Sequence, residues 1–354
     1  MAEKVLVTGG FGLVGSQTVR RLVEIGHDVV ATDLGTPRQR KTVLPANAEA
    51  RWADLTDQGE VDRLVAEVSP TAIVHLAAAI PPPVYRNPGL GRRVNVDATA
   101  ALLRAAQSNP RPPRFILASS NAVYGARNPH RHQDRLRADS PLRPSDLYGA
   151  HKVEAEDLVR ASDLEWVILR LGGVISVDPR AMPFTGDALY FESALPTDGR
   201  IHTVDVRDVA AAFAAATTAD VVGEVLLIAG DESHLHRQKD VGVAMAAARG
   251  LSNVLPAGRP GDPDSDESWF VTDWLDTARA QQALSFQRHS WPDMLAEMRA
   301  AAGWQRYAMF LVAPAARQFL KRQAAYRNAP GRYADPWAAI RSRLGDPRPD
   351  AAAD

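Results

Sequence analysis

The chain has 354 residues, 45% of them hydrophobic and 23% charged, which is typical of a globular protein with a large buried core. Its formal net charge of −1 indicates no general affinity for nucleic acid or membrane, and the absence of cysteine excludes disulfides, thiolate catalysis and cysteine-ligated metal sites. Because no signal peptide and no apolar run of membrane-spanning length is recognisable, we expect a cytoplasmic enzyme.

A glycine-rich turn follows the first predicted strand, residues 4–8, and a helix is predicted directly after it, up to about residue 25. Its glycines have the spacing G-x-x-G-x-x-G, and residues without a Cβ let the backbone turn tightly and approach a pyrophosphate. The phosphates would meet free N–H groups at the start of the helix. The pattern therefore predicts a dinucleotide site built from Gly9, Gly12, Leu13, Val14 and Gly15.

The second predicted strand, residues 28–32, ends at Asp33, 18 residues past Gly15. A carboxylate at this place can accept hydrogen bonds from a ribose 2′-OH and would repel a 2′-phosphate, so NAD is expected rather than NADP. The basic loop that follows, residues 38–41, is expected to be solvated, although Arg38 or Arg40 could reach a 2′-phosphate.

Strands and helices continue to alternate along the chain, which predicts βαβ units and a parallel sheet covered on both faces. Thr56 or Asp57 is expected to cap the next helix, which runs to about Val68. Further strands are predicted at 50–53, 114–118, 166–170 and 225–229, and 72–79 reads as a buried strand followed by small residues. Further helices are predicted at 94–107 and 148–162.

The predicted organisation is an α/β fold, a Rossmann-type doubly wound parallel sheet with a smaller substrate-binding lobe and a helical C-terminal extension. Residues 1–171 would form the dinucleotide-binding domain, completed by about 203–230. Residues 172–202 and 231–297, where the strand and helix pattern weakens, would form the lobe. Residues 298–354 would form the extension.

Two stretches carry the residues expected to act chemically, 119–125 and 148–152. Tyr148 and Lys152 are four residues apart in a predicted helix, so both side chains can reach one site. An ammonium group near a tyrosine, together with an oxidised nicotinamide, favours the phenolate and lowers the tyrosine pKa from about 10 toward working pH. Ser120 can then hold a substrate oxygen while Tyr148 removes or returns its proton.

Together these motifs resemble the extended short-chain dehydrogenase/reductase family of NAD-dependent epimerases and dehydratases, over about residues 3–297. The resemblance implies NAD as cofactor, Ser120 as the residue that positions substrate, Tyr148 as acid/base, and Lys152 as the ligand of the nicotinamide ribose that also tunes Tyr148. The remaining cofactor contacts that it implies are Asp54 and Leu55 at the adenine, Leu76, Ala77 and Ala78 along the nicotinamide, and Asn95 near the bound cofactor.

The expected activity is hydride transfer at a secondary alcohol or ketone carbon of a sugar, sugar acid or nucleotide sugar. The family's 4,6-dehydratases carry an Asp-Glu pair where this chain has Asn121 and Ala122, so elimination would lack its acid and base. Many nucleotide-sugar epimerases carry an Asn shortly after a Leu-Arg pair, where this chain has 171–173, and the local sequence is somewhat closer to uronate dehydrogenases. A hydroxysteroid or lipid alcohol dehydrogenase and a non-catalytic, dinucleotide-sensing regulator remain as alternatives.

Further substrate contacts are considered at Asn121, at Tyr85, which ends a proline-rich segment that could wall the site, and at His202. The histidines at 130, 132, 234 and 236 lack the paired carboxylates of a metal site and are expected in surface loops. We therefore expect no metal.

The extension has an unusual charge distribution, because 298–334 contains seven Arg or Lys and no Asp or Glu. Apolar residues between Trp304 and Phe319 recur near helical spacing, and Pro314 would kink or divide the helix. The helix would pack on the core or on a second subunit of a homodimer, or it would make a peripheral contact with anionic membrane lipid. Residues 346–354 are expected to be disordered.

Overall fold

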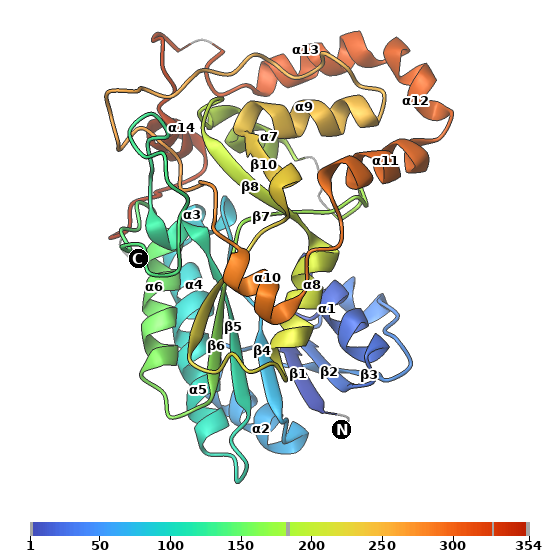
Figure 1. The fold of residues 1–354 in the computed structure, drawn as a ribbon, viewed down its shortest axis with the longest axis vertical. Helices are drawn as coiled ribbons and strands as arrows, with labels where there is room; N and C mark the ends of the chain where they lie inside the picture. The colour runs from blue at the N-terminus through green and yellow to red at the C-terminus, as the bar shows by residue number, and fades with distance from the viewer. Residues whose placement is uncertain (1–2, 182–184, 328, 352–354) are drawn as a thin grey trace.

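The structure is a computed structural model that describes residues 3–181, 185–327 and 329–351. Seven parallel strands form the main sheet in the order β3-β2-β1-β4-β5-β6-β9 (Figure 1). The order reverses direction at β1 and β4, which is the place where open α/β sheets bind their ligands. The strands are β1 (Lys4–Thr8), β2 (Asp28–Asp33), β3 (Ala48–Trp52), β4 (Ala72–His75), β5 (Arg114–Ser120), β6 (Trp166–Leu171) and β9 (Glu224–Ile228).

Helices cover both faces of this sheet and bury two separate apolar cores. On β1, Val5 and Val7 join one core and Leu6 joins the other, as the alternation of side chains along a strand requires. The first core lies under α1 (Leu13–Glu24), α8 (Val206–Ala216) and α10 (Ala278–Leu284), and the second under α2 (Gln58–Val68), α5 (Ala98–Gln107) and α6 (Leu147–Arg160). These observations confirm the predicted fold class.

A smaller lobe lies beyond the carboxyl ends of the main strands (Figure 1). Its sheet has the order β10-β8-β7. The strand at 200–205 belongs to this sheet, whereas the sequence assigned its end to the completed dinucleotide-binding domain. The elements of the lobe are β7 (Gly173–Ile175), α7 (Gly186–Ala194), β8 (Arg200–Asp205), β10 (Leu235–Arg237), α9 (Gln238–Ala248) and α11 (Trp291–Ala302).

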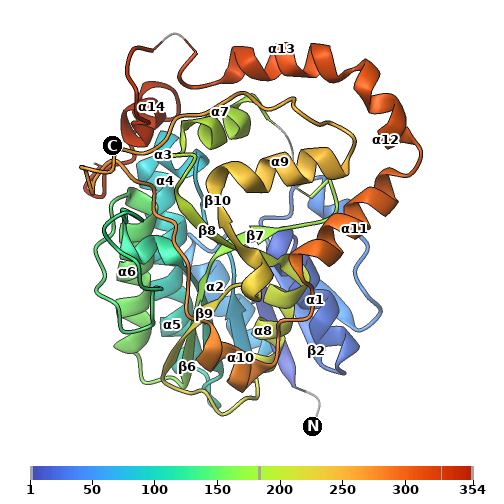
Figure 2. The same cartoon turned by 45° about the horizontal axis from the view of Figure 1, so that its top comes forward.

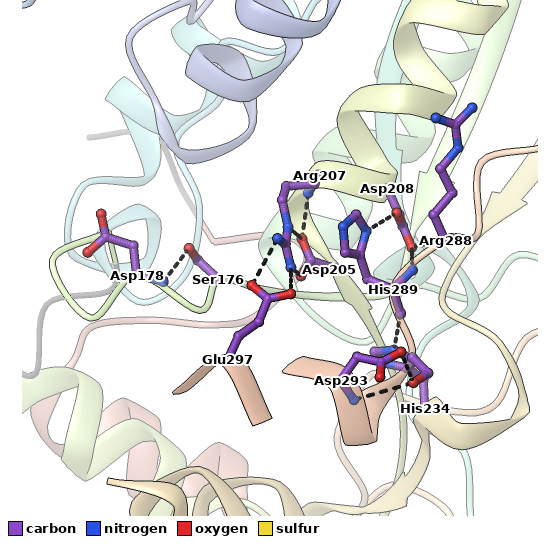
Figure 3. Close-up of polar contacts among 11 residues, drawn as sticks. Ser176, Asp178, Asp205, Arg207, Asp208, His234, Arg288, His289, Asp293 and Glu297 are labelled. Atoms are coloured by element: carbon purple, nitrogen blue, oxygen red, sulfur yellow. Dashed lines mark hydrogen bonds and ion pairs between the residues drawn. The ribbon is translucent and has the colours of Figure 1, made fainter. Parts of the chain in front are cut away.

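Ion pairs and hydrogen bonds join the lobe to α8, as Figure 3 shows. Arg207 lies between two carboxylates, 2.7 Å from Asp205 on β8 and 2.9 Å from Glu297 on α11. The next residue, Asp208, is 1% exposed, and its carboxylate accepts hydrogen bonds from the backbone N–H and the ring of His289. Consecutive residues at the start of one helix thus hold both the small sheet and the segment before α11.

The C-terminal extension divides into an outer part and an inner part. Pro314 stands at the start of α13, so the predicted break in the helix is confirmed. The final helix packs inward, with Ile340 and Leu344 fully buried beside Tyr85. The outer elements are α12 (Gln305–Ala308), a short 3₁₀ turn η5 (Met309–Leu311) and α13 (Ala313–Gln323), and the inner helix is α14 (Pro336–Arg343).

The end of the chain differs from the predicted disorder over the residues that the structure describes. The N–H of Asp346 donates to the carbonyl of Tyr85 at 2.9 Å, and the N–H of Leu147 donates to the carbonyl of Pro347 at 2.8 Å. Polar composition suggested a solvated tail, but the apolar side of α14 carries this segment onto the core. Residues 352–354 lie outside the described residues.

One predicted element agrees with the structure, and another is more divided than the sequence indicated. The buried strand predicted from residue 72 ends at His75, and the small residues expected after it lie in the irregular segment 76–79. The helix expected at 94–107 consists of a π-helical turn, Arg93–Asp97, followed by α5, with the short helices α3 (Pro83–Arg86) and α4 (Pro88–Arg92) before it. The cap of α2 is as predicted, because the Asp57 carboxylate accepts from the N–H of Glu60 at 3.0 Å.

Candidate active site

The glycine turn between β1 and α1 has the shape that a pyrophosphate cradle needs. Gly9 has φ +63°, a left-handed conformation that favours glycine, and a Cβ on Gly15 would collide with the Gly9 carbonyl oxygen. Gly12 is the N-cap of α1, and no side chain caps that helix. The N–H groups of its first turn are therefore left for an anionic ligand, and the turn fits a dinucleotide.

Asp33 lies at the end of β2, where its Oδ1 atom accepts from the N–H of Leu34 at 2.9 Å. Trp52, at the end of β3, stacks against Phe11 of the glycine turn with ring centroids 4.8 Å apart. Arg40 is held nearby, because its Nε atom donates to the Gly35 carbonyl at 2.7 Å and its guanidinium lies 5.1 Å from the Trp52 ring centroid. These contacts give Arg40 a structural role.

We expect Asp33→Ala to reduce the preference for NAD over NADP by on the order of tenfold, because the substitution removes one charge-assisted hydrogen bond and one repulsion. Titration of both cofactors into the wild type and the variant, followed by intrinsic fluorescence, measures this change. Asp28→Ala, which removes an exposed carboxylate at the opposite end of the same strand, is the matched control. Tighter binding of NADP than NAD to the wild type would contradict the assignment.

The other predicted cofactor contacts surround the same sheet edge. The Asp54 carboxylate accepts from the N–H and the hydroxyl of Thr56 at 2.9 and 2.7 Å, and Leu55 is 8% exposed. Asn95 fixes the segment after β4 by accepting from the N–H of Ala79 at 2.8 Å and donating to its carbonyl at 2.9 Å. This pairing supports the backbone of Leu76, Ala77 and Ala78, and it places Asn95 in a supporting position.

His75 is a part of this edge that the sequence reasoning missed. Its ring is buried between the hydroxyls of Thr8 at 2.7 Å and Thr99 at 3.0 Å. Burial, with the charge of Lys152 second, lowers the pKa of His75 to about 3, so the ring is neutral at physiological pH. It links the ends of β1 and β4 to the helix that begins at residue 98. The sequence feature that could have identified His75 is a histidine at the end of a buried strand.

Ser120, Tyr148 and Lys152 meet at the carboxyl end of β5. The Ser120 hydroxyl oxygen accepts from the N–H of Ala122 at 3.1 Å. The Lys152 ammonium donates to the Ala118 carbonyl at 2.8 Å and lies 5.7 Å from the centroid of the Tyr148 ring. The structure therefore brings the three predicted catalytic side chains together from one strand end and one helix.

In the protein without bound cofactor, burial determines the protonation of Lys152 and Tyr148. It lowers the pKa of Lys152 to about 8, partly offset by the charge of Glu156. It also raises the pKa of Tyr148 well above its usual value, with the charge of Asp146 acting in the same direction and contact with Ser120 acting against both. Without cofactor the protein therefore keeps Tyr148 protonated, and the lowered pKa that the sequence predicts for Lys152 and an oxidised nicotinamide together stays a prediction.

Asp146 orients the catalytic helix, and the sequence reasoning did not identify it. It is fully buried, caps α6 by accepting from the N–H of Gly149 at 3.0 Å, and accepts from the Tyr85 hydroxyl at 2.6 Å. Burial raises the pKa of Asp146 to about 6. Tyr85 is 1% exposed, and its hydroxyl is bonded to Asp146. It therefore supports the helix that carries Tyr148.

A buried ion pair fixes the other end of the same helix to the sheet. Glu156, which is fully buried, accepts from the Ser119 hydroxyl at 2.5 Å and pairs with Arg170 of β6 at 2.6 Å. Breaking a buried pair by removing one partner is costly, so this contact keeps α6 against β5 and β6. It therefore helps to position the helix that carries Tyr148 and Lys152 relative to the ends of the strands.

The remaining substrate candidates lie in different environments. Both ring nitrogens of His202 are engaged, one 3.0 Å from the Gly230 carbonyl and one accepting from the N–H of Leu275 at 3.2 Å. His202 is 2% exposed, so we leave it out of the proposed substrate contacts. Asn121 adjoins Ser120, and its buried Nδ2 atom has no hydrogen-bond partner among the described residues. That atom is therefore available for a substrate oxygen.

Two other classes of site are absent from the described residues. No described helix combines the length and the apolar character needed to span a bilayer. Within the same residues, no group of three or more His, Asp or Glu side chains is arranged to hold a metal ion. His234, expected in a surface loop, is fully buried and bonds to Thr203 at 2.8 Å and to the His289 carbonyl at 2.9 Å.

Known proteins resemble this chain in both sequence and structure. D-erythronate dehydrogenase from Cupriavidus necator is 35% identical over 190 residues, 49% of this chain and 56% of that protein. UDP-glucose 4-epimerase from Azospirillum brasilense is 30% identical over 182 residues, covering 50% of this chain and 51% of the epimerase. The chain thus spans about half the length of the curated relatives it matches.

Among solved structures, the Bordetella bronchiseptica enzyme WbmH in complex with NAD+ has a TM-score of 0.67 at 25% identity, covering 86% of this chain and 99% of WbmH. Thermus thermophilus UDP-glucose 4-epimerase in complex with NAD shares the fold, with a TM-score of 0.68 at 24% identity over 84% of this chain and 98% of the epimerase. The profile of the NAD dependent epimerase/dehydratase family matches residues 5–229. The chain therefore belongs to the NAD dependent epimerase/dehydratase family, and NAD is its cofactor.

Proposed function

We propose that the protein is an NAD-dependent dehydrogenase that oxidises a secondary hydroxyl group of a sugar acid. The observation that carries the proposal is the convergence of Ser120, Tyr148 and Lys152 beside the glycine turn at one sheet edge. Ser120 would hold the substrate hydroxyl, Tyr148 would accept its proton, and Lys152 would hold the nicotinamide ribose. NAD supplies the ring that accepts the hydride when it is bound.

The side chains next to Ser120 argue against elimination. Asn121 and Ala122 occupy the place of the acid and base of the family's dehydratases, and neither can donate or remove a proton at neutral pH. The N–H of Ala122 instead fixes the Ser120 hydroxyl. This arrangement supports simple proton removal at a substrate oxygen.

Two observations favour a sugar acid over a nucleotide sugar. The relative at 35% identity is named a D-erythronate dehydrogenase. Where many nucleotide-sugar epimerases carry an asparagine, the segment 171–173 of this chain has Leu, Gly and Gly, so it offers no side-chain amide to such a substrate. The structure offers no comparable observation for a steroid or lipid alcohol.

Turnover assays with NAD and a panel of substrates test the proposal. We expect the absorbance of reduced nicotinamide to rise with aldonates such as D-erythronate or with uronates, and to stay flat with UDP-glucose and with hydroxysteroids. Product analysis by NMR accompanies each assay. Conversion of UDP-glucose to its epimer without accumulation of reduced cofactor would assign the protein as an epimerase and overturn the proposal.

The same preparation tests one alternative function and the oligomeric state. A dinucleotide-sensing regulator would bind NAD without turning over any member of the panel. We also propose a homodimer, which sedimentation equilibrium of the full chain measures directly.

A further inference from the structure

The outer part of the C-terminal extension, which we call the arm (residues 304–323), exposes large apolar side chains that the proposed function does not use. Figure 2 shows α12 and α13 along the outer margin of the molecule, beside the small lobe. Exposed apolar clusters of this kind mark interaction surfaces. The exposed fractions are 76% for Trp304, 68% for Tyr307, 69% for Leu311, 47% for Val312 and 53% for Phe319.

The arm and the residues around it carry charge of one sign. The segment 298–334 has no acidic residue, and within the described residues none of its basic side chains forms an ion pair with a carboxylate. These side chains are Arg299, Arg306, Arg317, Lys321, Arg322, Arg327 and Arg332.

The apolar and basic side chains of the arm form two exposed rows. Leu311, Ala315 and Phe319 recur every four residues and are exposed, so they follow one side of the helix and the turn before it. Arg317 and Lys321 have the same spacing and form a second exposed row on another side of the helix, because residues two apart in a helix do not face each other. An apolar row on one side and a basic row on another is the pattern of helices that lie in a membrane interface.

A cavity of about 510 Å³ opens beside the basic row, between α13 and the loop at 256–259. Arg259 is fixed there, because its guanidinium donates to the Ala329 carbonyl at 2.6 Å and lies 4.6 Å from the Tyr326 ring centroid. Lys321, Arg322 and Arg327 also line the cavity, and no carboxylate does. Four cationic side chains around one opening suit a phosphate group.

We propose that the arm docks on an anionic lipid bilayer, with its apolar row in the interface and a lipid phosphate in the cavity beside α13. Charge complementarity favours this occupant over a second copy of the chain. A twofold contact would press the same cations against each other, because it uses one patch on both subunits. The proposal does not depend on the substrate or on turnover.

Sedimentation of the full chain with vesicles tests the proposal, using phosphatidylcholine vesicles with and without about one third phosphatidylglycerol. At low salt we expect the protein to pellet with the anionic vesicles, to stay in solution with the neutral ones, and to be released by high salt. Recovery of the protein in the supernatant with both kinds of vesicle would overturn the proposal.

Paired variants distinguish vesicle binding through the arm from binding through the net charge of the protein. Lys321→Gln with Arg322→Gln should weaken binding by on the order of tenfold or more, since each basic group near an anionic surface contributes roughly fivefold. Leu311→Ser with Phe319→Ser should weaken it as well. The control is Arg63→Gln with Arg111→Gln, which removes two exposed charges elsewhere and should leave binding unchanged. Each variant is first checked for native NAD affinity and circular dichroism.

Two results would contradict the assignment of the surface. Equal loss of binding in the control pair would show attraction by net charge, with no role for the arm. A concentration-dependent dimer in sedimentation velocity that Leu311→Ser with Phe319→Ser abolishes would show that a second copy covers the apolar row.

Discussion

Replacing Tyr148 by phenylalanine is expected to lower kcat by about 10²–10⁴-fold while leaving the affinity for NAD within about twofold. The substitution removes only the hydroxyl that would accept the substrate proton, and the ring keeps its packing near Lys152. Steady-state kinetics and a fluorescence titration of NAD measure the two quantities. Tyr333→Phe, at a half-buried tyrosine in the C-terminal extension, is the matched control and should keep full activity.

The pH dependence gives a second readout of the same residue. Burial raises the pKa of Tyr148, so oxidation by the wild type should accelerate with pH as the phenolate becomes accessible. The rise should weaken around pH 8, where about half of the Lys152 ammonium groups have lost their proton in the chain without cofactor. Tyr148→Phe should lose the rising limb. A variant that keeps both the limb and more than about a hundredth of the rate would show that another group is the base.

Replacing Lys152 by methionine is expected to reduce both activity and NAD affinity, because the ammonium would serve the ribose and the tyrosine together. We expect kcat/KM to fall by at least about 10²-fold and the Kd for NAD to rise by on the order of tenfold. Lys239→Met, on the exposed side of α9, is the control. Unchanged NAD affinity would contradict the ribose contact.

The same substitution should stabilise the chain without cofactor at pH 7, because it removes a buried charge. The folded pKa of Lys152 is about 8, below its usual 10.5, so the unfolded chain binds more protons between these values. The wild type therefore gains stability as pH rises through this window and carries the full cost below it. After the lost hydrogen bond to Ala118, a net gain of about 1 kcal/mol is expected. Thermal unfolding at pH 7 and pH 10 measures it, and the gain should shrink at pH 10.

The amino-acid sequence alone was sufficient for the features that depend on local spacing. The glycine turn, the acid at the end of the second strand and the Tyr148/Lys152 pair each lie within one βα unit, so their geometry follows from strand and helix periodicity. The alternation of strands and helices then predicted the parallel sheet, which brings Ser120 and the glycine turn to one edge.

Contacts between distant segments required the tertiary structure. Nothing local to Asp146 indicates that Tyr85 would donate to it, or that the chain from Asp346 onward would lie against Tyr85 and Leu147. The pKa of Tyr148 likewise depends on burial, and burial is set by segments up to two hundred residues away. The apolar pattern of the arm did not reveal which of its sides stays uncovered, because that depends on which surfaces α7 and the loop at 256–259 present to it.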